Sequence, residues 1–135
     1  MMDDAILKLI LSAILGGIIG FEREKAHRPA GLRTHMIVCL SSCLATLVGI
    51  HQHTDPLRLA ANVLTGIGFI GAGTIIATSE NIKGITTAAT IFSVACIGIA
   101  VGAGLYILSI FFTLLVFVIL WIKNIEKSDS RIFGY

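Results

Sequence analysis

The amino-acid sequence predicts an all-α integral membrane protein, a bundle of about five short transmembrane helices. Hydrophobic residues make up 56% of its 135 residues and charged residues only 13%. A soluble domain carries charge on about a quarter of its residues, which it needs to cover its core. Five apolar runs, each close to the roughly 20 residues that cross a bilayer, occupy residues 5–21, 32–50, 59–78, 85–101 and 105–122.

The first two runs flank a charged loop. Lys8 interrupts the first run near its start, where its stem can extend toward the interface. Pro29 and Gly31 predict a turn within the polar segment 22–35. Thr34 is a candidate N-cap for the second run, and Asp55-Pro56 marks the connection to the third.

The last three runs are separated by short breaks at residues 79–84 and 102–104. Short connections predict antiparallel neighbours. The second break is so brief that runs four and five could instead form one bent element. We therefore predict one transmembrane domain over residues 1–122 and a short cytoplasmic tail over 123–135, too short and polar to fold alone.

The basic residues predict an orientation, because cytoplasmic loops are enriched in Lys and Arg. With five spans, one side receives only Lys8 and Arg58. The other side receives the remaining eight, Arg23, Lys25, Arg28, Arg33, Lys83, Lys123, Lys127 and Arg131. This distribution predicts the amino terminus outside and the carboxy terminus in the cytoplasm.

Closely spaced glycines predict where helices touch, because they allow two backbones to approach. The small residues of the first run recur every four positions, and the third run is the richest in glycine. These residues are Ser12, Gly16 and Gly20, then Gly66, Gly68, Gly71 and Gly73. Because its glycines lie on two faces, the third helix is predicted at the centre of the bundle. The fifth run has no glycine from Leu105 to Trp121 and is predicted to face lipid.

Several polar residues within the runs are candidates for a pathway or for packing. Gly66 to Gly71 formally matches a dinucleotide fingerprint but lacks the preceding strand, so no cofactor is expected. A helix broken at Gly71 to Gly73 could expose backbone groups to an ion, although packing alone explains the glycines. Asn62 is expected to bond to another helix, and the Thr86, Thr87, Thr90 and Ser93 hydroxyls could line a pore or bond to backbone.

The first loop mixes acidic and basic residues in a compact segment. Its candidate residues are Glu22, Arg23, Glu24, Arg28, Arg33 and His35. They could anchor the topology and contact anionic lipid, or they could form a specified docking surface. His51, His53 and Asp55 could hold a metal, but their spacing is loose. No catalytic motif and no nucleic-acid patch is evident, so the chain is predicted to be neither an enzyme nor a nucleic-acid binder.

The sequence resembles the membrane domain of the MgtC/SapB family. Segments that carry the resemblance are 20–24, 28–35, 55–58, 66–73, 83–90 and 98–106, in order along most of the chain. The resemblance implies an inner-membrane protein linked to magnesium homeostasis or survival inside hosts, acting by regulating membrane partners. It also implies that the soluble C-terminal domain of longer members, with any role attached to it, is lacking here.

These observations predict a non-enzymatic protein that acts by helix–helix interaction. Its partners would be the lipid bilayer and either further copies of itself or another membrane protein. The alternative is an oligomeric channel or transporter for an ion or small solute, since five helices are few for a pathway within one copy.

Overall fold

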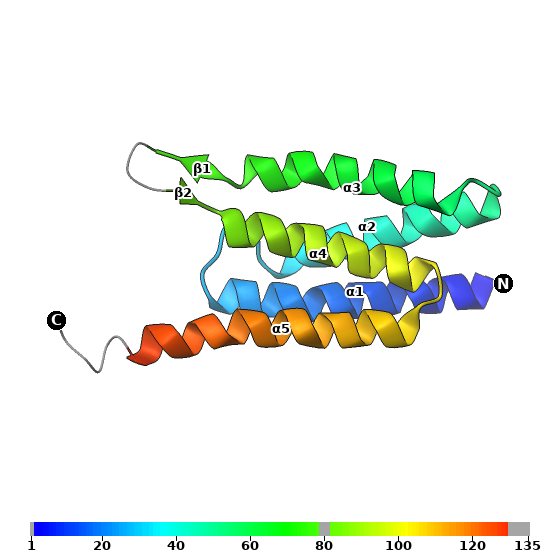
Figure 1. The fold of residues 1–135 in the computed structure, drawn as a ribbon. Coiled ribbons are helices and arrows are strands. Elements are labelled where there is room, and N and C mark those ends of the chain that lie inside the picture. Colours follow the sequence, from blue (N-terminus) through cyan, green and yellow to red (C-terminus); the bar gives the residue numbers. More distant parts are fainter. Residues whose placement is uncertain (1, 79–81, 130–135) are drawn as a thin grey trace.

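The computed structural model describes residues 2–78 and 82–129, and the prediction of an all-helical bundle is confirmed (Figure 1). Its elements in chain order are α1 (Met2–Lys25), α2 (Leu32–His51), α3 (Pro56–Gly73), β1 (Ile76–Ala77), β2 (Ile82–Lys83), α4 (Ile85–Gly102) and α5 (Tyr106–Asp129). Successive helices run antiparallel, so the short connections alternate between the two ends of the bundle.

The first residues of α2 and α3 explain where these helices begin. Asp55 precedes α3, and its Oδ1 accepts a hydrogen bond from the Leu57 N–H at 3.0 Å, while Pro56 needs no such partner. At α2 the Glu24 carboxylate reaches across the loop and accepts from the Leu32 N–H at 2.8 Å. The prediction that Thr34 caps α2 is wrong, because a carboxylate from α1 already satisfies this terminus.

The third apolar run does not stay helical to residue 78. The helix ends at Gly73, and Ile76–Ala77 pairs antiparallel with Ile82–Lys83 in a short hairpin that the sequence analysis did not predict. Consecutive β-branched residues, Ile75 and Ile76, favour an extended backbone at this point. Gly84 closes the hairpin with φ of 92°, where a Cβ would overlap the Thr74 carbonyl oxygen.

The break between the fourth and fifth runs is a true turn. Gly102 ends α4, Gly104 adopts φ of 84°, and α5 begins at Tyr106. Two separate antiparallel helices result, as the five-span topology requires. The helix α5 continues through Asp129, into the segment expected to form a tail.

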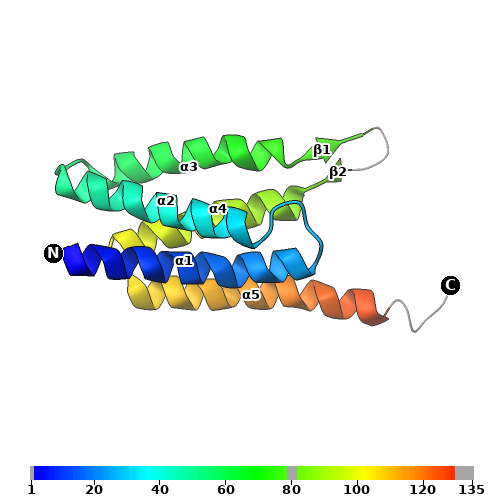
Figure 2. The ribbon, with the colours of Figure 1, turned by 180° about the vertical axis from the view of Figure 1, so that it is seen from behind.

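The core lies between α1, α2 and α4, and α4 packs against every other helix. Figures 1 and 2 show α3 at one edge of the bundle and α5 at the opposite edge. The prediction that the third helix is central is therefore wrong. Buried aliphatic side chains fill the centre instead, among them Ile19, Val38, Ile91, Val94, Ile97 and Val101.

The closest backbone contacts occur at the glycines of α1 and α4. A Cβ added at Gly16 would lie 2.7 Å from the His35 carbonyl oxygen, and one at Gly102 would lie 2.9 Å from that of Cys43. At Gly98 an added Cβ would overlap the Cys39 carbonyl oxygen. Close glycine packing is thus confirmed for the first run, and the glycines of α4 show it as well. It depends on α4 because that helix alone must fit among all the others.

Three helices are long and apolar enough to cross a bilayer by length and composition, over residues Asp3–Lys25, Leu32–His51 and Ile85–Gly102. The described apolar part of α5, Tyr106–Ile122, is shorter. Among the residues that the structure describes, α3 is not apolar enough to count as a fourth such helix. This helix therefore combines a peripheral position with a composition outside that of the three clear spans.

Candidate functional site

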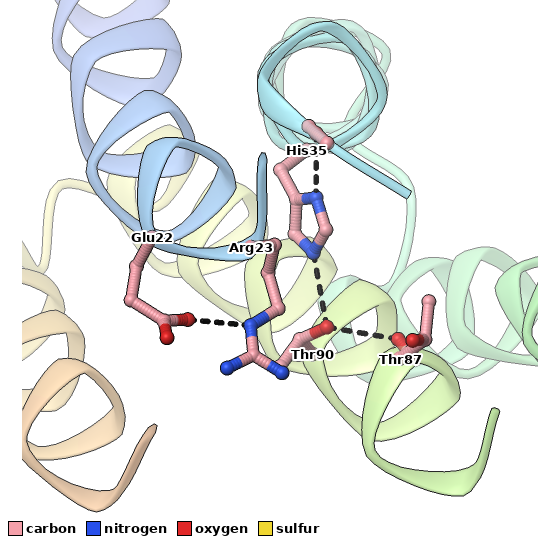
Figure 3. Close-up of polar contacts among 6 residues, drawn as sticks. Glu22, Arg23, His35, Thr87 and Thr90 are labelled. Carbon is pink, nitrogen blue, oxygen red and sulfur yellow. Dashed lines mark hydrogen bonds and ion pairs between the residues drawn. The ribbon is translucent and has the colours of Figure 1, made fainter. Parts of the chain in front are cut away.

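Five polar residues that the sequence singled out meet at one end of the bundle (Figure 3). We call Glu22, Arg23, His35, Thr87 and Thr90 the polar cluster. They come from the end of α1, the start of α2 and the start of α4. All five are buried, with His35 fully enclosed and Glu22 and Arg23 exposed by only 6% and 4%.

Glu22 and Arg23 form a buried ion pair, in which the Arg23 Nε donates to the Glu22 Oε2 at 2.5 Å. Taking two charges out of water costs several kcal/mol per ion, and only close pairing offsets that cost. From the sequence alone, these side chains were predicted to belong to a loop surface. Both are instead buried, with Arg23 directed from α1 toward α4 and Glu22 beside it (Figure 3). A buried charge pair requires a fixed arrangement of its neighbours.

His35 joins the loop to α4 through both ring nitrogens. Its Nδ1 lies 2.8 Å from the Gly31 carbonyl oxygen, which can only accept, so Nδ1 carries a proton. Its Nε2 lies 3.0 Å from the Thr90 Oγ1. A neutral ring with its proton on Nδ1 presents Nε2 as an acceptor, so Nε2 and the Thr87 carbonyl oxygen both face the single hydroxyl proton of Thr90.

The hydroxyl stripe on α4 serves the helix and the polar cluster. The Thr90 Oγ1 lies 2.9 Å from the Thr87 carbonyl oxygen, its second possible acceptor, and the Ser93 Oγ donates to the Ala89 carbonyl at 2.8 Å. Thr87 is buried and Thr86 is partly buried. These bonds match the structural alternative for the stripe, in which hydroxyls bond to backbone.

The remaining charged residues of the first loop lie outside the polar cluster. Arg28 and Arg33 are exposed, and Glu24 is also exposed while it caps α2. Gly31 was not among the predicted site residues, although its carbonyl fixes the His35 ring. A glycine directly before a helix was the available signal, since the N-cap carbonyl points into the first turn.

Removing the Thr90 hydroxyl tests the link between α2 and α4. Thr90→Val keeps the shape but leaves the His35 Nε2 without its partner, so we expect the free energy of unfolding to fall by about 1–2 kcal/mol. Unfolding in mixed micelles by increasing fractions of a denaturing detergent measures this change. Ser93→Ala is the matched control, because within the part of the chain that the structure describes its hydroxyl bonds to the Ala89 carbonyl of the same helix. Equal losses for both variants would contradict the role assigned to Thr90.

The outer face of α3 carries the other group of predicted residues. Asn62, Gly66, Phe69 and Gly73 follow one another at spacings of four, three and four, and all four are exposed. We call these residues the outer seam. The predicted close contacts at Gly66, Gly68 and Gly73 are absent within the described chain, because a Cβ added at any of them meets no atom within 4 Å. Gly71 alone faces α4, where its added Cβ would lie 3.6 Å from the Ala88 Cβ.

The outer seam differs from the other exposed helix faces. Bulky aliphatic and aromatic side chains cover α5, as expected for contact with lipid, and they also cover the outer side of α1. Examples are Ile6, Leu7, Ile10, Ile107, Phe111 and Ile119. On α3, by contrast, exposed glycines leave the helix backbone uncovered, and the Asn62 amide has no hydrogen-bond partner among the described residues.

The possible metal ligands do not assemble. His51, His53 and Asp55 are all exposed around the turn between α2 and α3. In the described ranges, 2–78 and 82–129, no group of three or more His, Cys, Asp or Glu side chains could hold a metal ion. The turn is shaped by His53, which adopts φ of 53°.

Known proteins resemble this chain over most of its length. "Putative magnesium transporter YhiD" of Escherichia coli K12 is 42% identical over 130 residues, which cover 89% of this chain and 60% of that protein. "Protein SapB" of Bacillus subtilis is 42% identical over 76% of this chain and 49% of its own length. "Protein MgtC" of Brucella abortus is 43% identical over 68% of this chain and 40% of its own length. No solved structure matches this fold.

The chain therefore spans about 40–60% of the length of these relatives. The sequence profile described as the MgtC family matches residues 9–128, which include every helix core and both the polar cluster and the outer seam. Together with the apolar helices, this match identifies a membrane protein. The chain belongs to the MgtC family.

Proposed function

We propose that this protein is a non-catalytic protein of the bacterial inner membrane, linked to magnesium homeostasis, that acts by binding another transmembrane helix along α3. The magnesium link is supported by the name of the relative from Escherichia coli, "Putative magnesium transporter YhiD". The mode of action is supported by the outer seam. We further propose that the end bearing the polar cluster faces the cytoplasm, because Lys25, Arg28, Arg33 and Lys83 gather there.

The main support for this proposal is that all residues of the outer seam are exposed. An exposed glycine brings the polar backbone of a helix close to its surroundings, and Asn62 adds an amide that hydrocarbon cannot satisfy. A neighbouring helix could approach closely at Gly66 and Gly73 and offer a partner to Asn62. The spacing of the outer seam is that of an interhelical seam, with Phe69 as a bulky side chain between two glycines.

Two glycine substitutions test the proposed contact. Gly66→Leu with Gly73→Leu adds bulk where the structure leaves open space, so the single copy is expected to fold normally. Association, measured by fluorescence energy transfer between labelled copies and by cross-linking to membrane partners in native membranes, is expected to be lost. Gly71 is left intact because it faces Ala88 of α4, and its replacement would disturb the bundle itself.

Val118→Phe with Ile119→Phe is the matched control, since it adds bulk to the exposed face of α5. In a strain that lacks its own family member, the wild-type protein and this control are expected to restore growth at low magnesium. The α3 variant is not expected to restore this growth. Normal association by the α3 variant would reject the proposed contact, whatever the growth result.

Transport is the second candidate, favoured by the name of the same relative and by the polar Asn62 within an apolar helix. Purified protein in liposomes that contain a magnesium-sensitive dye separates the two functions. Our proposal expects no magnesium entry above that of protein-free liposomes. Entry that Asn62→Leu abolishes would replace the interaction function with a transport function.

A further inference from the structure

A groove opens between the start of α1 and the end of α2, at the opposite end of the bundle from the polar cluster. Its volume is about 710 Å³. One part of its lining is charged or polar. Asp4 and Lys8 come from α1, His51 from the end of α2, and His53 from the turn that follows it. The other part is aliphatic and includes Leu44 and Val48. A small amphiphile would match this division.

The charged rim holds opposite charges side by side. The Lys8 Nζ lies 3.0 Å from the Asp4 Oδ2, and the Tyr106 hydroxyl donates to the Asp4 Oδ1 at 3.2 Å. The Lys8 side chain is only 15% exposed, whereas that of Asp4 is 60% exposed. An ammonium group is thus held against an apolar wall by one carboxylate, which a ligand can reach from outside.

The aliphatic wall opens sideways toward the bilayer. Leu44 and Val48 are 50% and 52% exposed, and both lie on α2, a helix apolar enough to span a membrane. A molecule that reaches the groove from the hydrocarbon would place its chain on these side chains. Its headgroup would then lie at the level of Asp4 and Lys8.

We propose that the groove binds a membrane phospholipid whose headgroup carries both a phosphate and a primary ammonium, the phosphatidylethanolamine class. The phosphate would bind to Lys8 and to the imidazoles of His51 and His53. The ammonium would pair with Asp4. Each charge of the existing ion pair would exchange one partner for another of the same sign, so no buried charge is left alone. An acyl chain would lie along Leu44 and Val48.

The rim selects this class over two other common headgroups. A choline headgroup has the same charges, but its quaternary ammonium has no N–H to donate to Asp4. A glycerol headgroup carries a net negative charge and no ammonium, so Asp4, with the exposed Asp3 beside it, opposes its binding. The preference therefore depends on a hydrogen-bond donor that is also a cation.

Binding of three lipids with identical dioleoyl chains tests the proposal. Native mass spectrometry of the full chain, released from micelles, measures the dissociation constants of the phosphatidylethanolamine, phosphatidylcholine and phosphatidylglycerol forms. We expect the wild-type protein to bind the ethanolamine form about tenfold more tightly than the other two, as one charge-assisted hydrogen bond would give. Equal dissociation constants for all three lipids would overturn the proposal without any variant.

Two substitutions then test which side chain binds the ammonium and which binds the phosphate. Asp4→Ala lies at an exposed position and is expected to fold, to remove the preference for ethanolamine over choline, and to improve binding of the glycerol form. Lys8→Met is expected to weaken binding of all three lipids about tenfold. Ser93→Ala, on α4 and outside the groove lining, is the control and is expected to leave every constant unchanged. A preference that survives Asp4→Ala would overturn the assignment of the ammonium to Asp4.

Discussion

Gly98→Ala is expected to lower the free energy of unfolding by about 1–3 kcal/mol, although it adds a single methyl group. The added Cβ would overlap the Cys39 carbonyl oxygen and lie 2.9 Å from the Ser42 Cβ, so α2 and α4 would have to separate. Gly98→Leu is expected to prevent folding. Thermal unfolding in detergent, followed by the loss of the monodisperse species in size-exclusion chromatography, measures both effects.

Gly66→Ala is the matched control for this prediction, because it makes the same change on α3 in open space. Alanine favours a helix over glycine by up to about 1 kcal/mol, so this variant is expected to be as stable as the wild-type protein or slightly more so. If both alanine variants lost the same stability, the distinction between the packed glycines of α4 and the open glycines of α3 would be wrong.

Glu22→Leu is expected to destabilise the protein by about 3–5 kcal/mol, because it leaves a buried guanidinium without its carboxylate. Among the described residues, the partner of Arg23 is Glu22, and the Arg23 side chain is only 5% exposed. The free energy of unfolding, measured as for Thr90→Val, would show the loss. Glu22→Gln keeps an acceptor near the Arg23 Nε and is expected to lose less.

The double variant Glu22→Leu with Arg23→Leu separates pairing from burial. Removing both charges takes away the desolvation cost together with the ion pair, so much of the lost stability is expected to return. A double variant less stable than Glu22→Leu alone would show that Arg23 stabilises the bundle by contacts other than its ion pair. The polar cluster would then have to be explained without that pair.

The polar cluster lies in the interior of the bundle, whereas the outer seam lies on its surface. His35 ties α2 to α4 through Thr90, and Gly98 brings the same two helices into backbone contact farther along. Against this fixed core, α3 packs mainly on α4 and leaves its outer seam uncovered. A rigid support and an open face are what a helix-binding surface requires, since less order is then lost on binding.

The sequence by itself determined that the chain is a helical bundle and where most of its helices lie, whereas the structure decided that runs four and five are separate helices. Apolar runs of bilayer length have few other ways to satisfy their backbone, so helices at residues 5–21, 32–50 and 85–101 follow from composition alone. The placement of basic residues at one end also follows from the sequence, because alternating antiparallel spans leave no other arrangement. The hairpin after Gly73 was not predicted, because a two-residue strand is too short to show an alternating hydrophobic pattern.

Only the tertiary structure decided which glycines touch a neighbour and which polar residues meet. Glycine spacing is the same signal whether the facing helix belongs to this chain or to another molecule, so Gly66 and Gly98 look alike in the sequence. Glu22, His35 and Thr90 lie on three helices, and their contact depends on how those helices are rotated and docked. Periodicity fixes the face that a residue shares within one helix, whereas packing between helices fixes what that face meets.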